Sequence, residues 1–214
     1  MQLHTFFRSS ASYRVRIALN LKEIRYDAVA VHLSRNGGEQ FGADFDALNP
    51  QHLLPVLVDD GLVLPQSLAI LEYLDETHPA APLLPADPAG RARVRALSQM
   101  IACDIHPLNN LRVLNYLSRE LRLDVAQKDA WYRHWVGLGL EAFEAALVRS
   151  ADTGRFCHGD APGMADCCLV PQVFNARRFE CDTTGFPTMM RIHDACLELE
   201  AFQAAIPERQ LDAT

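Results

Sequence analysis

The sequence contains no Cys-x-x-Cys motif, and no cysteine occurs before position 103. The six cysteines all lie in the second half of the chain: Cys103, Cys157, Cys167, Cys168, Cys181 and Cys196. Cys167 and Cys168 are adjacent within an apolar helical pattern, which is typical of buried thiols and not of disulfides. This distribution excludes an oxidoreductase that carries its own redox pair, and it predicts a soluble cytoplasmic protein with reduced cysteines.

Other absences narrow the function classes further. No apolar run approaches the ~18 residues of a membrane span, and no charged-then-apolar leader opens the chain. The eight histidines form no His-Glu-x-x-His motif and no close pair, so we expect no metal site. The formal net charge of −7 argues against nucleic acid as a partner, because phosphate binding needs a basic face.

A chain of 214 residues suits one large or two small domains. Its hydrophobic fraction of 49% is enough to form a core. The first eighty residues alternate short apolar runs with helical patterns. The runs predict strands over residues 3–7, 26–31, 55–58 and 62–64, the last two joined by a hairpin at Asp59-Asp60-Gly61. Helices are predicted over 13–21, over 40–47 in irregular form, and after Ser67 as a cap.

A proline-rich stretch then interrupts the pattern at Pro79, Pro82, Pro85 and Pro88, and it reads as a linker. Only helices are predicted beyond it. A long helix covers residues 94–108 and should kink at Pro107, which lacks a backbone donor. Further helices are predicted over 124–148 and 164–178. At the start of the last one, Gly163 and Asp166 retain half of a capping box.

The segment from Arg8 to Leu19 carries the clearest chemical signal. Ser9 or Ser10 stands where a short strand turns into a helix, so a hydroxyl and the free N–H groups of the helix start point the same way. This arrangement favours a negative charge such as a thiolate. Because the turn reads Ser9-Ser10-Ala11-Ser12, it can hold a sulfur atom but does not supply one. The sulfur should come from a cofactor.

With this segment in view, the chain resembles the zeta class of glutathione transferases, and within it the maleylacetoacetate and maleylpyruvate isomerases. The likeness runs from Leu3 to about Pro207. It rests on the following motifs: residues 8–19, 48–50, 54–55, 66–70, 103–110 and 170–179. One departure is Ala11, where eukaryotic members of the class have cysteine. The resemblance implies an α/β thioredoxin-like N-terminal domain and an all-α C-terminal domain, with a glutathione-binding domain over 1–83, a linker over 84–90 and a substrate-binding domain over 91–214.

The resemblance also implies the site residues. Ser9, Ser10, Arg8 and Arg178 are expected to be catalytic. Glutathione is expected to contact Ser9, Ser10, Ala11, Ser12, Tyr13, Arg14, Gln40, His52, Leu54, Gln66, Ser67, His106, Asn110, Leu111 and Arg112. Leu54-Pro55 is expected to form a cis peptide bond that turns the Leu54 backbone toward the ligand.

Each of these residues also has a plain structural interpretation. Pro55 could simply begin a strand, without any role in binding. Gln66-Ser67 could simply cap a helix. His106 and Asn110 share a face if they lie on one helix, but a lone helical histidine is usually structural. Arg178 could simply complement the dipole at the C-terminal end of its helix, without a role in the site. The same holds for Arg177, which is expected to be more solvated.

The reaction implied is glutathione-dependent cis–trans isomerisation of maleylacetoacetate, in tyrosine breakdown. Maleylpyruvate is the second candidate substrate, and conjugation or dehalogenation of α-haloacids is a third activity. A catalytically silent interaction module is the alternative of another class. The guanidinium groups of Arg8 and Arg178 suit a small dicarboxylate. The resemblance further implies a homodimer in the cytoplasm.

Overall fold

The computed structural model describes residues 1–213 and divides them into two compact units. The first unit comprises Met1–Leu83 together with the chain from Leu197 onward, and the second comprises Leu84–Cys196. The first boundary falls where the sequence placed the end of the glutathione-binding domain. The expected range 91–214 for the other domain differs, because the last residues pack on the first unit.

The first unit is built on a four-stranded sheet of β1 (Gln2–Thr5), β2 (Asp27–Ala30), β3 (Val56–Asp59) and β4 (Leu62–Pro65), in the order β2-β1-β3-β4. β1 pairs with β2 in parallel and with β3 in antiparallel, and β3 and β4 form the expected hairpin. A parallel β1–β2 pair needs a crossover, which the intervening helix supplies.

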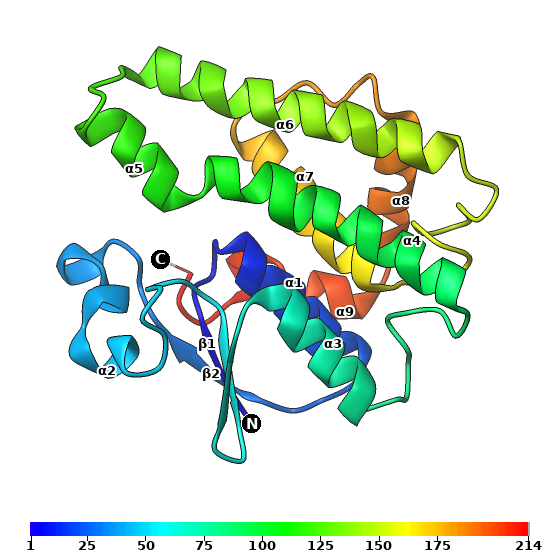
Figure 1. Ribbon diagram of the computed structural model, residues 1–214, viewed down its shortest axis with the longest axis horizontal. Coiled ribbons are helices and arrows are strands. Elements are labelled where there is room, and N and C mark those ends of the chain that lie inside the picture. The colour runs from blue at the N-terminus through cyan, green and yellow to red at the C-terminus, as the bar shows by residue number, and fades with distance from the viewer. Residues whose placement is uncertain (214) are drawn as a thin grey trace. The chain divides into compact units, whose positions relative to one another are not determined.

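Helices cover both faces of this sheet, as Figure 1 shows. α1 (Ser10–Leu21) and α3 (Ser67–Thr77) pack against each other, and α2 (Ala43–Asp46) contributes Phe45 to a separate apolar cluster. Val56 lies in the Phe45 cluster, whereas its neighbour Leu57 is fully buried outside it. Alternate residues of a strand face opposite sides, so β3 is buried between the two helical layers. This is the thioredoxin-like arrangement expected from the sequence.

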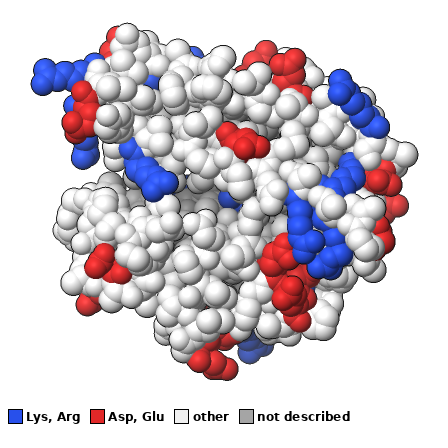
Figure 2. All heavy atoms as spheres, viewed as in Figure 1, with Lys and Arg blue, Asp and Glu red and all other residues white. Residues whose placement is uncertain are grey.

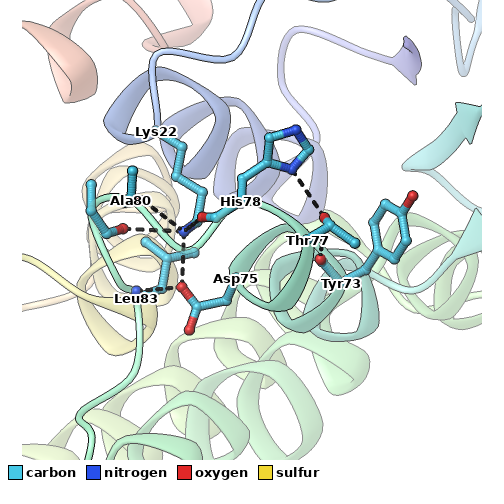
Figure 3. A network of polar contacts seen from close by, with 8 residues as sticks. Lys22, Tyr73, Asp75, Thr77, His78, Ala80 and Leu83 are labelled. Atoms are coloured by element: carbon cyan, nitrogen blue, oxygen red, sulfur yellow. Dashed lines mark hydrogen bonds and ion pairs between the residues drawn. The ribbon is translucent and has the colours of Figure 1, made fainter.

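The buried ammonium group of Lys22 holds the segment that follows α3, residues 78–83, in place (Figure 3). Nζ of Lys22 lies 2.9 Å from Oδ1 of Asp75 and donates to the carbonyl oxygens of His78, Ala80 and Ala81 at 2.8, 3.2 and 3.1 Å. The same carboxylate oxygen accepts the Leu83 N–H at 2.7 Å. The Lys22 side chain has no exposed surface. A buried charge is costly when it lacks partners, but each N–H donor of the Lys22 ammonium group has an acceptor here. Lys22 therefore fixes the backbone of residues 78–83.

The expected linker over 84–90 is shorter than predicted. α4 (Pro88–Gln99) begins inside it, with Pro88 at the first helical position and Asp87 capping the Gly90 N–H at 2.8 Å. Proline is favoured there because the first N–H of a helix has no partner within the helix. The proline that signalled a linker therefore also starts a helix.

The second unit is helical throughout its regular structure. Its α-helices are α4, α5 (Leu111–Arg119), α6 (Val125–Val148), α7 (Met164–Arg178) and α8 (Pro187–Leu197), whose last residue is assigned to the first unit. α7 has ten consecutive buried residues, 164–173, and so forms the centre of this unit. The bounds of α7 match the prediction, and α6 begins one residue after its capping Asp124. α5, α8 and the short α9 (Glu200–Gln203) were not predicted.

The long helix expected over 94–108 is interrupted. α4 ends at Gln99, a π-helical turn covers Met100–Ile105, and a 3₁₀ turn covers His106–Asn109. Pro107 removes a backbone donor, which explains the break in the α-helical ladder at this point. α6 packs closely on the π-helical turn, because a Cβ on Gly139 would collide with the side chain of Ile105.

The start of α7 is held by a buried carboxylate. Asp166 accepts the Gly163 N–H at 2.8 Å through one oxygen and the Cys157 N–H at 2.9 Å through the other. This is the retained half of the capping box. Burial raises the pKa of Asp166 above its ordinary value, and burial also raises the pKa of the Cys157 and Cys196 thiols beside it. These cysteines are therefore buried, weakly acidic thiols without the thiolate character that nucleophilic cysteines need.

Candidate active site

The serine turn has the geometry that the sequence predicted. Ser9 is the N-cap of α1, with extended backbone angles, and its Oγ accepts the Ser12 N–H at 3.2 Å. A serine hydroxyl also carries one donor proton, which this accepted bond leaves available. Ser9 is partly exposed, whereas Ser10 begins the helix and is buried at 5% exposure. Ser9 is thus the better placed of the two hydroxyls for a ligand.

Three of the residues expected to contact glutathione have buried side chains. Ser12 has no exposed surface, and Tyr13 and Arg14 are each 2% exposed. Their contacts with glutathione remain predictions. The guanidinium of Arg14 donates to the Ser67 hydroxyl at 3.1 Å, joining α1 to the start of α3. Residues 11–14 lie in the first two turns of α1, and those of their side chains that face inward join the core of the unit. Ala11 remains partly exposed beside the cap.

At the start of α3 the cap lies one residue before the predicted Ser67. Gln66 occupies the N-cap position and Ser67 is the first residue of the helix. Gln66 has a φ of 72°, in the left-handed region that non-glycine residues rarely adopt. Its side chain is exposed and donates to Gln51 Oε1 at 2.9 Å, so it does not cap the helix. Strained backbone of this kind is concentrated at ligand-binding sites, and the free N–H groups of the helix start favour a carboxylate.

The expected cis peptide bond is present between Leu54 and Pro55. Strand β3 begins at Val56, two residues after Leu54. The backbone N–H and C=O of Leu54 therefore lie outside the hydrogen-bond ladder of the sheet. The Leu54 side chain packs on the cluster formed by Val31, Phe45 and Val56. This packing anchors the residue while its amide and carbonyl stay outside the strand pairing.

Gln40 and His52 interact with each other. Nδ1 of His52 lies 2.9 Å from the carbonyl oxygen of Gln40, and Nε2 lies 3.5 Å from Oδ1 of Asp46. His52 therefore ties two loops together, which agrees with a structural role. Gln40 is 5% exposed, and among the described residues its Oε1 has no hydrogen-bond partner. A buried amide oxygen without a donor is costly, so Gln40 is the better ligand candidate of the two.

Arg8 is the exposed residue of the turn. Its guanidinium lies 5.8 Å from the centre of the Phe6 ring and 4.9 Å from that of Phe7. Stacking on the two rings limits the motion of a long side chain while its charge stays in solvent. A cation is thus held one residue before the Ser9 cap.

In the second unit, the expected face shared by His106 and Asn110 does not exist. His106 begins the 3₁₀ turn, whereas Asn110 is the N-cap of α5 and accepts the Arg112 N–H at 3.1 Å. The spacing rule for an α-helix does not apply across this break. Leu111 and Arg112 form the exposed first turn of α5. Their contacts with glutathione, and that of His106, remain predictions.

Arg178 ends α7 and is exposed. Its guanidinium lies 5.1 Å from the centre of the Phe179 ring, which is stacked on Tyr132 at 3.7 Å with an interplanar angle of 14°. Burial raises the pKa of Tyr132, and the positive charge of Arg178 acts in the opposite direction. The aromatic pair thus supports Arg178 from α6, a relationship that no local pattern in the sequence signals.

Sequence reasoning also missed Asn109. Both polar atoms of its side chain are buried, and neither has a hydrogen-bond partner among the described residues. The available signal was the group of polar residues Asn109, Asn110 and Arg112 in an otherwise apolar helical region. An unsatisfied carboxamide of this kind needs an explanation, and a bound polar ligand would provide one.

The described residues contain no group of three or more metal-ligating side chains in metal-binding arrangement, and none of their helices combines the length and apolarity needed to span a bilayer. Figure 2 shows acidic and basic side chains in small separate groups on the face it presents. The expectations of no metal and no nucleic acid remain predictions from the sequence.

Comparisons with known proteins agree with this geometry. Residues 8–77 match the family model of the glutathione S-transferase N-terminal domain. A probable maleylacetoacetate isomerase of Vibrio cholerae is 51% identical over 99% of this chain and 97% of its own length. A solved holo structure of a maleylpyruvate isomerase, described as a zeta-class bacterial glutathione transferase, is 48% identical over the whole of both chains, with a TM-score of 0.97.

A maleylacetoacetate isomerase structure from Methylobacterium extorquens AM1, solved with malonate and GSH, is 44% identical over 100% of both chains with a TM-score of 0.95. Similarity at this level over whole chains extends to both units. The chain therefore belongs to the glutathione transferase family, in the zeta class that includes maleylacetoacetate and maleylpyruvate isomerases.

Proposed function

We propose that this protein is a glutathione-dependent cis–trans isomerase of maleyl-keto acids. The observation that carries the proposal is the Ser9 cap: a helix N-terminus with an available hydroxyl proton and no sulfur of its own. When bound, glutathione would supply a thiolate for reversible addition to the carbon–carbon double bond conjugated with the substrate carbonyl, which lowers that bond to a single bond free to rotate until the thiolate leaves. The protein's own residues bind and orient glutathione and the substrate, and they stabilise the thiolate.

The groups of the first unit fit the three parts of glutathione. The N–H groups at the start of α3, with Gln66 and Ser67, suit the γ-glutamyl carboxylate. The Leu54 backbone suits the cysteinyl part, because an extended peptide pairs with free amide and carbonyl groups as an added strand does. Gln40, whose Oε1 has no described partner, suits the glycyl end. His106, Asn110, Leu111 and Arg112 are proposed to contribute from the second unit.

Ser9 then holds the thiolate. Its hydroxyl accepts the Ser12 N–H and so is oriented before the ligand arrives. A donor proton and the positive end of α1 both stabilise the negative form of a thiol, which depresses its pKa below the free-thiol range. Ser10 is buried at the first helical position, so Ser9 is the residue we assign to this role.

The arginines are proposed to bind the substrate. Arg8 and Arg178 are both exposed, and each is supported by an aromatic ring. A guanidinium binds a carboxylate through two parallel hydrogen bonds and stays charged at any physiological pH. Arg8 also lies next to the Ser9 cap, where it would help to stabilise negative charge that develops on the substrate oxygen.

Maleylacetoacetate, from tyrosine breakdown, is the first substrate candidate and maleylpyruvate is the second. The relatives named above include isomerases of both kinds. Conjugation or dehalogenation of α-haloacids is a secondary activity that the same thiolate could support. We further propose a cytoplasmic homodimer, since the class resemblance implies one and cysteines in the reduced form suit a reducing compartment.

The test is an assay of both maleyl-keto acids and one α-haloacid, each with and without glutathione, followed by the absorbance of the conjugated product. We expect isomerisation of at least one maleyl-keto acid, only when glutathione is present. If all three compounds are unchanged with glutathione at saturating concentration, the protein is instead a silent member of the fold. Light scattering on the same sample measures whether it is a dimer.

A further inference from the structure

We propose that the C-terminal segment positions the thiol-binding turn, with Asp212 and Arg16 as the residues that hold it. The proposal rests on the function proposed above, because it assigns a role to these residues in that same site. It concerns contacts within the first unit alone. No contact of either residue with glutathione or substrate is implied, so both are positioning residues.

Asp212 reaches back across almost the whole chain. Its Oδ2 accepts the backbone N–H of Phe7 at 2.9 Å. β1 ends at Thr5, so the Phe7 N–H lies beyond the sheet and needs an acceptor from elsewhere. The acceptor comes from the last residues of the chain. The contact fixes the peptide that joins Phe6 to Phe7, two residues before the Ser9 cap.

Arg16 binds the same peptide from the other side. This fully buried guanidinium donates to the carbonyl oxygens of Phe6 at 3.3 Å and Phe7 at 3.0 Å. Two further bonds, of 3.2 and 3.1 Å, go to the carbonyl oxygen of Ala205. Burial lowers the pKa of Arg16 to about 10, with Asp212 among the groups that raise it again, so the residue stays cationic. One side chain thereby joins the turn to the C-terminal segment.

The turn has little freedom left once these bonds are made. The Ser9 N–H donates to the Phe6 carbonyl at 2.9 Å, so the residue that Arg16 holds also holds the cap. The Phe6 and Phe7 rings, whose backbone is fixed in this way, carry the Arg8 guanidinium. The positions of the Ser9 hydroxyl and the Arg8 guanidinium therefore depend on the hydrogen bonds that Phe7 and Arg16 make with residues 205–212.

The consequence is catalytic as well as structural. Stabilisation of a thiolate by a hydroxyl depends on the donor lying within hydrogen-bond distance, and a misplacement of about 1 Å costs up to a hundredfold in rate. Loss of the Asp212 acceptor leaves the Phe7 N–H without its partner and loosens the turn beside Ser9. The pKa of the bound thiol should rise as a result.

The experiment compares Asp212→Ala, Asp212→Asn and a chain that ends at Asp212. The asparagine variant keeps an oxygen acceptor for the Phe7 N–H, and the shortened chain keeps Asp212 itself. For each we measure the ultraviolet titration of the glutathione thiol on the protein, kcat and KM, and amide hydrogen exchange of residues 7–10. The exchange measurement needs no ligand.

We expect Asp212→Ala to raise the thiol pKa, to lower kcat at neutral pH by about three- to thirtyfold and to speed exchange at residues 7–10. Asp212→Asn should recover most of each effect, and the shortened chain should match the parent. An unchanged thiol titration with unchanged exchange in Asp212→Ala overturns the proposal. If the parent protein binds no glutathione, the proposed function fails, whereas the exchange result still decides whether Asp212 holds the turn.

Discussion

The guanidinium of Arg14 and the hydroxyl of Ser67 are joined by a buried hydrogen bond of 3.1 Å. Arg14 lies in the second turn of the helix that Ser9 caps, and Ser67 is the first residue of α3. The bond therefore links the proposed thiolate site to the proposed γ-glutamyl site. Although neither helix start is near the other in sequence, the two cannot move independently.

Replacing Arg14 by Met should weaken glutathione binding. Ser67 loses a charged donor, and such a bond contributes about 1.5–3 kcal/mol, which corresponds to roughly ten- to a hundredfold in Kd. Calorimetric titration of glutathione measures the effect, with the exposed Arg25→Met as the matched control. An Arg14→Met protein that folds and binds glutathione as tightly as the control would show that the link is not needed.

Lys22 is predicted to be a determinant of stability. Lys22→Met leaves the Asp75 carboxylate without its cation and three carbonyl oxygens without a donor. Breaking a buried ion pair in this way typically costs about 3–5 kcal/mol of unfolding free energy. Denaturant unfolding gives the number directly.

Two comparisons make the Lys22 measurement specific. The double variant Lys22→Met with Asp75→Asn should recover part of the loss, because no unpaired charge remains. Arg209→Ala, which removes an exposed ion pair with Glu200, should change stability by less than about 1 kcal/mol. Equal losses in the buried and exposed pairs would contradict the assignment.

Stability should fall as the pH drops below neutral, partly through His193. Burial lowers the pKa of His193, with Arg177 acting in the same direction and the hydrogen bond to Asp194 opposing. Below about pH 6.5 the unfolded chain binds a proton that the folded protein resists, so the unfolding free energy declines until the folded pKa is passed.

His193→Gln removes this contribution. Between pH 7 and 5 the parent protein should lose stability more steeply than the variant, by at most about 1.4 kcal/mol per pH unit. Asp166, whose pKa is raised, is present in both proteins and cancels in the difference. Parallel curves of unfolding free energy against pH would rule out the role of His193.

Ser9 and Arg178 should fail in different ways. Ser9→Ala should raise the pKa of bound glutathione and lower the rate at neutral pH by roughly ten- to a hundredfold, because a charge-assisted bond is lost. Arg178→Ala should raise the substrate KM and leave the thiol titration almost unchanged. A shift of the thiol titration in Arg178→Ala as large as that in Ser9→Ala, at constant KM, would reverse the assignment.

The parts of the fold that the sequence predicted are those with strong local signals. The hairpin at Asp59-Asp60-Gly61, the apolar helix over 164–178 and the serine turn each have residues whose own geometry specifies them. The cis peptide bond at Leu54-Pro55 was implied by family resemblance alone, since the bond before a proline is trans in most proteins.

The features that the sequence did not signal depend on contacts between distant residues. The guanidinium of Arg14 donates to the hydroxyl of Ser67, fifty-three positions away. The Phe7 N–H is satisfied by Asp212, and no local pattern connects residues so far apart in sequence. The break after Gln99 was placed too late because Pro107 predicts a kink near itself, whereas the π-helical turn begins seven residues earlier.

In the proposed reaction the nucleophilic sulfur comes from glutathione and not from a cysteine of the protein, and glutathione is regenerated in each turnover. The most direct measurement is the number of product molecules formed per glutathione, at limiting glutathione with the thiol assayed at the end. We expect many turnovers per glutathione, full recovery of the thiol and no product when glutathione is absent. Product formed without glutathione, or one thiol consumed per product, would contradict the proposed reaction.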